Sequence, residues 1–89
     1  MAKYKIKVKT SAAKEIKAID SKKDRIAIIR KIESLSENPR LDGAIKLSNK
    51  EKYRVRQGQF RILYQIFDDI VEVNVVKVAH RKHVYREKR

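Results

Sequence analysis

The chain has 89 residues and a mass of 10.5 kDa, enough for one small domain that buries about 60–65% of its unfolded surface. It contains no cysteine, which excludes disulfide scaffolds, thiolate metal sites and thiol nucleophiles. Lysine and arginine outnumber aspartate and glutamate by 24 to 11, so the net charge is +13, yet 42% of the residues are hydrophobic and the chain is expected to fold. Such a charge indicates a polyanionic partner, either a nucleic acid or an acidic protein.

The first half of the chain is predicted to form one strand and two helices. In Tyr4–Lys9, apolar residues alternate with lysines, which is the period of a strand with one buried and one cationic face. The hydroxyl of Thr10 or Ser11 can then cap a first helix, in which apolar residues follow at helical spacing. A second helix is expected over Lys23–Glu37, and Asn38-Pro39 ends it because a residue before proline is disfavoured in the α conformation.

The second half is predicted to form antiparallel strands. After a short extended segment at Ile45–Leu47, strands at Tyr53–Arg56 and Phe60–Phe67 flank the hairpin turn Gln57-Gly58-Gln59. Asp68-Asp69 makes the next turn, where aspartate is common.

The final strand is expected over Ile70–Val78. Its alternation slips at Val75-Val76, which predicts either a bulge or a strand buried on both faces. The order of elements is therefore β-α-α-β-β-β over residues 1–89, an α+β single domain in which a helical hairpin packs on an antiparallel sheet. No apolar stretch is long enough for a signal peptide or a membrane span, so a cytoplasmic protein without membrane contact is expected.

Three arginines are predicted to share one face of the hairpin. Arg54 and Arg56 point to one side of their strand, while Tyr53 and Val55 point to the other. Across the turn, Arg61 alternates with apolar residues and can join the same face. Guanidinium groups this close repel one another unless an anion lies between them, and their planar forks suit phosphate oxygens. A solvated strand face is the alternative interpretation, although the clean apolar pattern on the other side favours a functional surface.

The basic tail, His80–Arg89, adds candidates for phosphate contact and proton transfer. If the final strand lies beside the hairpin, Arg81 and Tyr85 reach the arginine face, where nearby cations favour an ionised phenol; Tyr85 can equally anchor the tail by packing on the sheet. His80 is either a second proton carrier or a hydrogen-bonded residue at a strand end. His80 and His83 are the two histidines, and without a nearby carboxylate or thiolate they make a poor metal site, so no metal or other cofactor is expected.

The segments YRVRQGQFRILYQI (residues 53–66) and VEVNVVKVAHRKHVYR (residues 71–86), joined by the DD turn, resemble the signature of the RelE/ParE toxin superfamily of bacterial and archaeal toxin–antitoxin systems. The order of elements and the helix ending in ENP (residues 37–39) agree with this resemblance, which covers nearly the whole chain and is weakest from Arg40 to Lys52. RelE-type members are ribosome-dependent endoribonucleases that cut mRNA in the ribosomal A site without a metal, and thereby inhibit translation and arrest growth.

The resemblance implies a catalytic set. Carried over by position, it falls on Arg54, Arg56, Arg61, Arg81 and Tyr85. The two positions on the first hairpin strand are often lysine in the family. Arginine stays protonated and cannot act as a base, so Arg54 and Arg56 are expected to act electrostatically, and proton transfer is left to Tyr85 or His80. The residue before His80 is commonly glycine in relatives and is Ala79 here.

The resemblance also implies the partners. An antitoxin with acidic and amphipathic segments is expected to cover the basic face of a monomeric toxin. The ribosome and mRNA are the expected targets, and further cations are expected to hold ribosomal RNA without base specificity. These cations are Lys3, Lys5, Lys7, Lys9, Lys82, Arg86, Lys88 and Arg89.

Two other functions stay open at this point. ParE-type relatives share the fold and the hairpin motif but inhibit DNA gyrase and cut no RNA; they generally lack the pairing of Arg81 with Tyr85 that stands in HRKHVYR. A noncatalytic RNA- or DNA-binding domain is the second alternative, for which the charge alone is sufficient.

Overall fold

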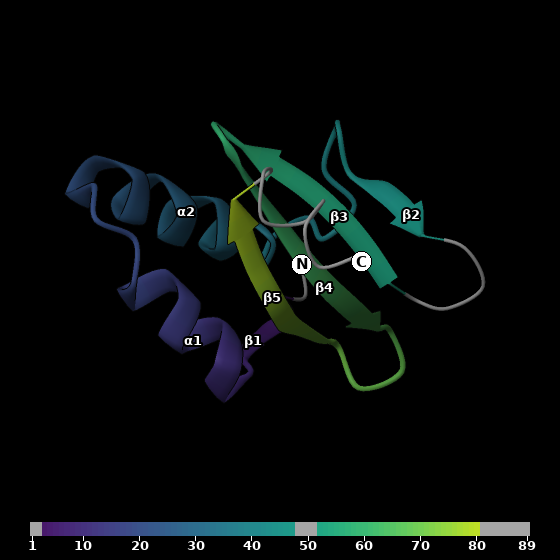
Figure 1. Cartoon of the computed structure of the whole chain (residues 1–89). Coiled ribbons are helices and arrows are strands. Elements are labelled where there is room, and N and C mark those ends of the chain that lie inside the picture. The colour runs from purple at the N-terminus through teal and green to yellow at the C-terminus, as the bar shows by residue number, and fades with distance from the viewer. Residues whose placement is uncertain (1–2, 48–51, 81–89) are drawn as a thin grey trace.

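The computed structural model describes residues 3–47 and 52–80, and Figure 1 shows two helices and a twisted sheet in that part of the chain. In chain order the elements are β1 (Lys5–Val8), α1 (Thr10–Lys17), α2 (Lys22–Ser34), β2 (Ile45–Leu47), β3 (Lys52–Gln57), β4 (Phe60–Phe67) and β5 (Glu72–His80). The strands form one sheet in the order β1-β5-β4-β3-β2, and the helices pack against one of its faces. This arrangement is the α+β fold predicted from the sequence.

The sheet differs from the prediction in two respects. Ile45–Leu47, expected only as an extended segment, pairs with β3 and adds a fifth strand. β1 pairs with β5 in parallel, whereas the other neighbours are antiparallel. Alternation identifies a strand without identifying its neighbour or direction, and the helical hairpin after β1 supplies part of the long connection that parallel neighbours need.

The start of α1 also differs from the prediction. Lys9 occupies the N-cap position without a side-chain cap, and Thr10 is already helical, so the predicted capping by Thr10 or Ser11 is wrong. The sheet explains this, because the Lys9 amide donates a 2.8 Å hydrogen bond to the carbonyl oxygen of Val75. Strand pairing therefore continues up to the residue at which the helix begins.

The second helix begins one residue before the predicted start and ends three residues before the predicted end. Ser21 caps it, since its Oγ accepts a 3.2 Å hydrogen bond from the Asp24 amide. Beyond Ser34, the amides of residues 35–37 each bond the carbonyl three residues back, which tightens the chain before Pro39.

The last strand contains a bulge, which is one of the two alternatives predicted for it. Leu63 pairs with Lys77 and Tyr64 pairs with Val75, so Val76 is an extra residue on β5. The strand begins at Glu72 and not at Ile70, because residues 68–71 form the preceding turn.

The core fills the space between the helices and the sheet. Fully or nearly fully buried side chains come from α1, α2 and the helix-covered face of β3, β4 and β5; among them are Ala12, Ile28, Ile32, Leu35, Val55, Ile62, Tyr64, Ile66, Val73, Val75 and Val78. Because side chains alternate along each strand, the intervening residues lie on the other face of the sheet, which neither helix covers. That second face is the one available for function. Within the described residues, no helix has the length and hydropathy that crossing a bilayer requires.

A polar cluster ties the loop after α2 to the β4–β5 turn. Arg40 places both terminal guanidinium nitrogens on the Asp68 carboxylate, at 3.2 and 2.8 Å, and the Tyr4 hydroxyl donates a 2.7 Å hydrogen bond to the same group. These hydrogen bonds lower the pKa of Asp68 to about 2, and the Arg40 guanidinium has a larger effect than the Tyr4 hydroxyl. One residue before Arg40, the carbonyl oxygen of Pro39 accepts a 2.7 Å hydrogen bond from the buried Tyr64 hydroxyl. The cluster is structural and lies away from the hairpin turn.

Candidate functional site

The three hairpin arginines lie on the face of the sheet that the helices leave uncovered. Arg56 on β3 and Arg61 on β4 are direct cross-strand partners, so their side chains leave the sheet on the same side. Arg54 lies two residues before Arg56 and therefore on the same side, opposite Leu63. This arrangement agrees with the prediction from the sequence, and the short turn around Gly58 produces it by setting the register of the hairpin.

These arginines differ in burial. Arg56 is exposed and Arg54 is half-buried, whereas Arg61 is only 9% exposed. The partner of Arg61 on β5 is Ala79, whose small side chain occupies little of the face on which the arginines lie. A guanidinium held at this depth faces a lower effective dielectric than one in water, which strengthens its attraction for an anion. The surface therefore combines one buried cation with two more accessible ones.

A small cavity of about 20 Å³ opens beside this pair at the hairpin turn, lined by Arg56, Gly58, Gln59, Phe60 and Arg61. Its volume corresponds to roughly one water molecule. Gly58 has φ +61°, a conformation that favours glycine, and the turn it allows is what brings the ends of β3 and β4 together. The cavity is therefore too small to hold a phosphate group.

The structure does not bring His80 to the arginine face. His80 pairs with Phe60, and its ring meets the Phe60 ring edge-on, with centroids 5.2 Å apart and planes at 82°. Phe60 packs against the core on the helix-covered side, so His80 lies on that side too. The Val76 bulge is the cause: one extra residue reverses the alternation of β5, which turns Ala79 to the arginine face and His80 away from it.

The lysines of the first strand are spread along the other edge of the sheet. Lys5 and Lys7 lie in register with Glu72 and Asn74, on the same face as the arginines. β5 separates them from Arg61, and β5 and β4 separate them from Arg54 and Arg56. Lys7 forms a 3.6 Å ion pair with Glu72. Outside the strand, Lys3 pairs with Glu37 at 3.8 Å, and Lys9 is exposed at the start of α1. These lysines form an exposed cationic edge, and they are not part of the arginine cluster.

The remaining predicted site residues lie outside the described residues. They are Arg81 and Tyr85 of the catalytic set and the basic residues Lys82, Arg86, Lys88 and Arg89. Over residues 3–47 and 52–80, no group of three histidine or acidic side chains is placed to hold a metal ion.

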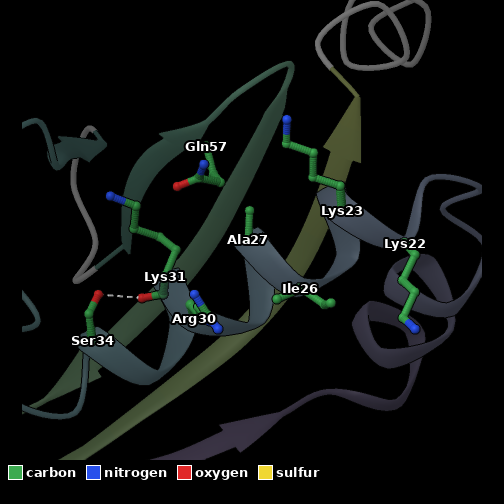
Figure 2. Close-up of a pocket in the computed structure, with 8 residues that line it drawn as sticks. All are labelled: Lys22, Lys23, Ile26, Ala27, Arg30, Lys31, Ser34 and Gln57. Atoms are coloured by element: carbon green, nitrogen blue, oxygen red, sulfur yellow. Dashed lines mark hydrogen bonds between the residues drawn. The ribbon is translucent and has the colours of Figure 1, made fainter.

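The sequence interpretation missed a groove beside the hairpin (Figure 2). A cavity of about 730 Å³ lies between α2 and the end of β3, lined by Lys22, Lys23, Ile26, Ala27, Arg30, Lys31, Ser34 and Gln57. A second cavity, of about 420 Å³, adjoins it at Lys31 and is bordered by Asp42, Gly43, Ile45, Arg54, Val55 and Arg56. We call these two cavities together the α2–β3 groove. The signal in the sequence was Ile26 at the edge of the helical stripe, since this residue proves to be 41% exposed.

Comparison with known proteins identifies the family of this chain. The profile of the family described as the ParE toxin of the type II toxin–antitoxin system parDE matches residues 6–85. The chain therefore belongs to this family of the RelE/ParE superfamily and is a toxin of a type II toxin–antitoxin system. No curated protein sequence matches it at a significant level.

Several solved structures share the fold. The isolated E. coli RelE toxin is 27% identical in sequence, with a TM-score of 0.75 over 96% of this chain and 94% of that chain. A chain of the toxin–antitoxin complex RelBE2 from Mycobacterium tuberculosis is 24% identical, with a TM-score of 0.78 over 90% and 93% of the two chains. A chain of the archaeal RelE–RelB complex from Pyrococcus horikoshii OT3 is 21% identical, with a TM-score of 0.78 over 89% and 96%.

Proposed function

We propose that this toxin is a metal-independent endoribonuclease that cuts mRNA in the ribosomal A site and thereby inhibits translation in the cytoplasm. The observation that carries the proposal is the convergence of Arg54, Arg56 and Arg61 on the face of the sheet that neither helix covers, with Arg61 largely buried. Guanidinium groups gathered in this way are suited to the charge of a phosphodiester in its reactive geometry. The similarity to the isolated E. coli RelE toxin supports this function over a general nucleic-acid-binding role.

The proposed chemistry needs the RNA, cationic side chains and a group that accepts the 2′-proton. The 2′-oxygen of the ribose attacks the adjacent phosphorus and loses its proton, the bond from phosphorus to the 5′-oxygen breaks, and the leaving oxygen takes up a proton. The products are a 2′,3′-cyclic phosphate and a 5′-hydroxyl. Charge on the phosphoryl oxygens increases in the transition state, so preorganised cations bind that state more tightly than the ground state.

The roles proposed for Arg54, Arg56 and Arg61 are based on their positions, and those proposed for Arg81 and Tyr85 are based on the resemblance to RelE-type toxins. Arg61, buried and opposite Ala79, is proposed to hold the scissile phosphate together with Arg81, and removal of one such donor typically costs about 2.7–4 kcal/mol of transition-state stabilisation. Arg54 and Arg56 orient the substrate and favour the ionised form of Tyr85, which accepts the 2′-proton. His80 is not assigned a proton-transfer role, because it lies on the opposite face of β5.

Partners are proposed on the same basis. The exposed lysines Lys3, Lys5, Lys7 and Lys9, with the basic residues of the tail, would hold ribosomal RNA through its phosphates. The free toxin is proposed to be a monomer that an acidic, amphipathic antitoxin neutralises. Solved relatives from M. tuberculosis, P. horikoshii and E. coli are toxin–antitoxin complexes, which supports such a partner.

Primer extension on a defined mRNA in a reconstituted translation system tests the enzyme activity. The wild type is compared with Arg61→Ala and Tyr85→Phe, and Lys14→Ala on the exposed face of α1 is the matched control. We expect cuts only on ribosome-bound message, at the A-site codon, with a loss of roughly 10²–10³-fold for Arg61→Ala and no change for the control. Intact message with inhibited translation would contradict cleavage and leave a noncatalytic ribosome-binding domain.

Inhibition of DNA gyrase is the second candidate function, because the matching family is described by the ParE toxin. A supercoiling assay with purified gyrase separates the two candidates. The nuclease proposal predicts normal supercoiling at toxin concentrations that abolish translation. Inhibited supercoiling together with unaffected translation would establish the gyrase function instead.

A further inference from the structure

A carboxylate on α1 bonds the backbone of β5 just beyond the end of β1, where Figure 1 shows α1 beside these two strands. Ala12 and Ile16 bury one face of α1, and Glu15, three residues after Ala12, lies half-buried beside that face. One Glu15 oxygen accepts a 2.8 Å hydrogen bond from the Val78 amide, and the other accepts a 3.1 Å hydrogen bond from Nζ of Lys77. Glu15 therefore contacts β5 immediately after the bulge at Val76.

The Val78 amide faces α1 because of this bulge. In a regular strand, the backbone groups of alternate residues point to the same edge. The Val75 carbonyl points to the β1 edge, since it accepts a hydrogen bond from the Lys9 amide, so regular alternation would direct the amide of Lys77 to α1. The extra residue, Val76, shifts the alternation by one position, and the amide of Val78 points there instead. Glu15 thus bonds a backbone group that the bulged pairing presents to it.

The bulge also decides which side chain lies next to Arg61. In the bulged pairing, the partner of Arg61 is Ala79. Without the extra residue, pairing would continue regularly from Tyr64 and Val75, and Val78 would become the partner of Arg61. Its branched side chain would leave the core and stand on the arginine face, where the methyl group of Ala79 now leaves more room. A phosphate held by Arg61 needs that room.

We propose that Glu15 is a positioning residue for Arg61: by holding the Val78 amide it fixes the bulge, and it thereby keeps Ala79 opposite the arginine. This inference rests on the proposed function, because its consequence is measured as RNA cleavage. A charged acceptor strengthens the hydrogen bond to the amide. The Val78 side chain, which is 3% exposed, favours the same pairing by its burial. Removing the carboxylate therefore loosens the bulge and does not reverse it.

Single-turnover cleavage of ribosome-bound mRNA at increasing ribosome concentrations separates the rate constant at saturation from the half-saturating concentration. We expect Glu15→Ala to lower the rate constant about tenfold, because Arg61 loses its fixed surroundings, and to change the half-saturating concentration less than about twofold. Glu15→Gln keeps an oxygen that can accept from the Val78 amide, so its rate constant should stay within about threefold of the wild type.

Tyr64→Phe is the control for a loss of stability alone, with all variants assayed at a temperature at which circular dichroism shows them folded. It also removes a buried hydrogen bond, but at the Pro39 carbonyl, and should cleave like the wild type. Equal rate constants for the wild type and Glu15→Ala, or equal losses in Glu15→Ala and Tyr64→Phe, would overturn the proposal.

Nuclear magnetic resonance tests the positioning without any enzymatic activity. We expect a nuclear Overhauser contact between the Ala79 methyl group and the Arg61 side chain in the wild type and in Glu15→Gln, and a weakened contact in Glu15→Ala. The Val78 amide of the wild type should exchange slowly with solvent, and fast exchange would overturn the proposal without requiring any variant to fold. An unchanged contact in Glu15→Ala would also overturn it.

The two measurements together distinguish failure of this inference from failure of the proposed function. A wild type that cuts no message, with an Ala79–Arg61 contact that depends on Glu15, would refute the nuclease function alone. A wild type that cuts message at a rate independent of Glu15 would refute the positioning role alone.

Discussion

Replacing Tyr64 by phenylalanine is expected to destabilise the fold without changing the arginine face. The Tyr64 side chain has no exposed surface, and its hydroxyl donates a 2.7 Å hydrogen bond to the carbonyl oxygen of Pro39, a buried residue. Burial raises the pKa of Tyr64 to about 12, so the hydroxyl remains a donor throughout the neutral range. The ring also stacks on Tyr53, with centroids 5.8 Å apart, and phenylalanine keeps that contact. The substitution therefore removes one hydrogen bond and little else.

The size of the expected loss of stability depends on the Pro39 carbonyl oxygen, which the substitution leaves without its hydrogen-bond donor. A buried acceptor that loses its partner costs about 1–3 kcal/mol, so we expect the free energy of unfolding to fall by about 2 kcal/mol. For a domain of this size, that loss lowers Tm by about 8–16 °C. The slope of the denaturation curve against urea should stay the same, since the surface exposed on unfolding does not change.

Urea denaturation followed by circular dichroism measures this loss, with Tyr53→Phe as the matched control. The Tyr53 hydroxyl accepts a longer hydrogen bond, 3.3 Å, from Nε of the exposed Arg40, so its removal should cost less than about 1 kcal/mol. A Tyr64→Phe protein as stable as the wild type, or no less stable than Tyr53→Phe, would refute the claim that the Pro39 carbonyl depends on this hydroxyl.

Three further predictions concern other parts of the fold. Val71 has φ +53°, a conformation that costs a β-branched residue about 1–2 kcal/mol. Glycine avoids this strain but loses about 0.5–1 kcal/mol more conformational entropy on folding, so Val71→Gly should raise Tm by a few degrees in a thermal melt. A lower Tm would contradict strain at this residue. The half-buried Glu15 carboxylate accepts hydrogen bonds from the Val78 amide (2.8 Å) and from Nζ of Lys77 (3.1 Å), so Glu15→Ala should cost about 1–3 kcal/mol in urea denaturation and Glu15→Gln, which can still accept from the amide, clearly less. Equal losses for the two Glu15 variants would show that the charge matters and the amide bond does not. The pKa of Asp68 in the folded protein, about 2, lies below its ordinary value of 3.8, so the stabilising contribution of this carboxylate is present above about pH 4 and is lost as the pH falls toward 2. Asp68→Asn should therefore flatten the dependence of stability on pH, measured from pH 2 to 5. An unchanged dependence would exclude this carboxylate as its source.

Much of the local structure could be predicted from residue periodicity. The period of two in Tyr4–Lys9 and in the hairpin strands identified β1, β3 and β4, and the helical spacing identified α1 and α2 within a few residues. The limits of α1 could not be found in this way. Its start depends on the hydrogen bond from the Lys9 amide to Val75, a residue 66 positions away, and a capping motif read locally contains no information about that contact.

Part of the candidate site could likewise be predicted from local sequence, and part depended on the tertiary structure. Arg54, Arg56 and Arg61 share a face because a short turn joins two neighbouring strands, so the sequence determines their relation without the rest of the fold. The position of His80 depended on where β5 gains its extra residue. The slip at Val75-Val76 predicted a bulge, but a strand buried on both faces was an equal alternative, and only the pairing with β4 places His80 beside Phe60.

The sequence by itself thus determined the number and type of the main elements, the hairpin register and the cationic character of its outer face, because these depend on neighbours within a few residues. The tertiary structure decided which strands became neighbours, how deeply Arg61 is buried and which edge of β3 remains open beside α2. Those properties arise from contacts between residues far apart in the chain. Their energies depend on burial and on shared hydrogen bonds, which no local pattern of residues specifies.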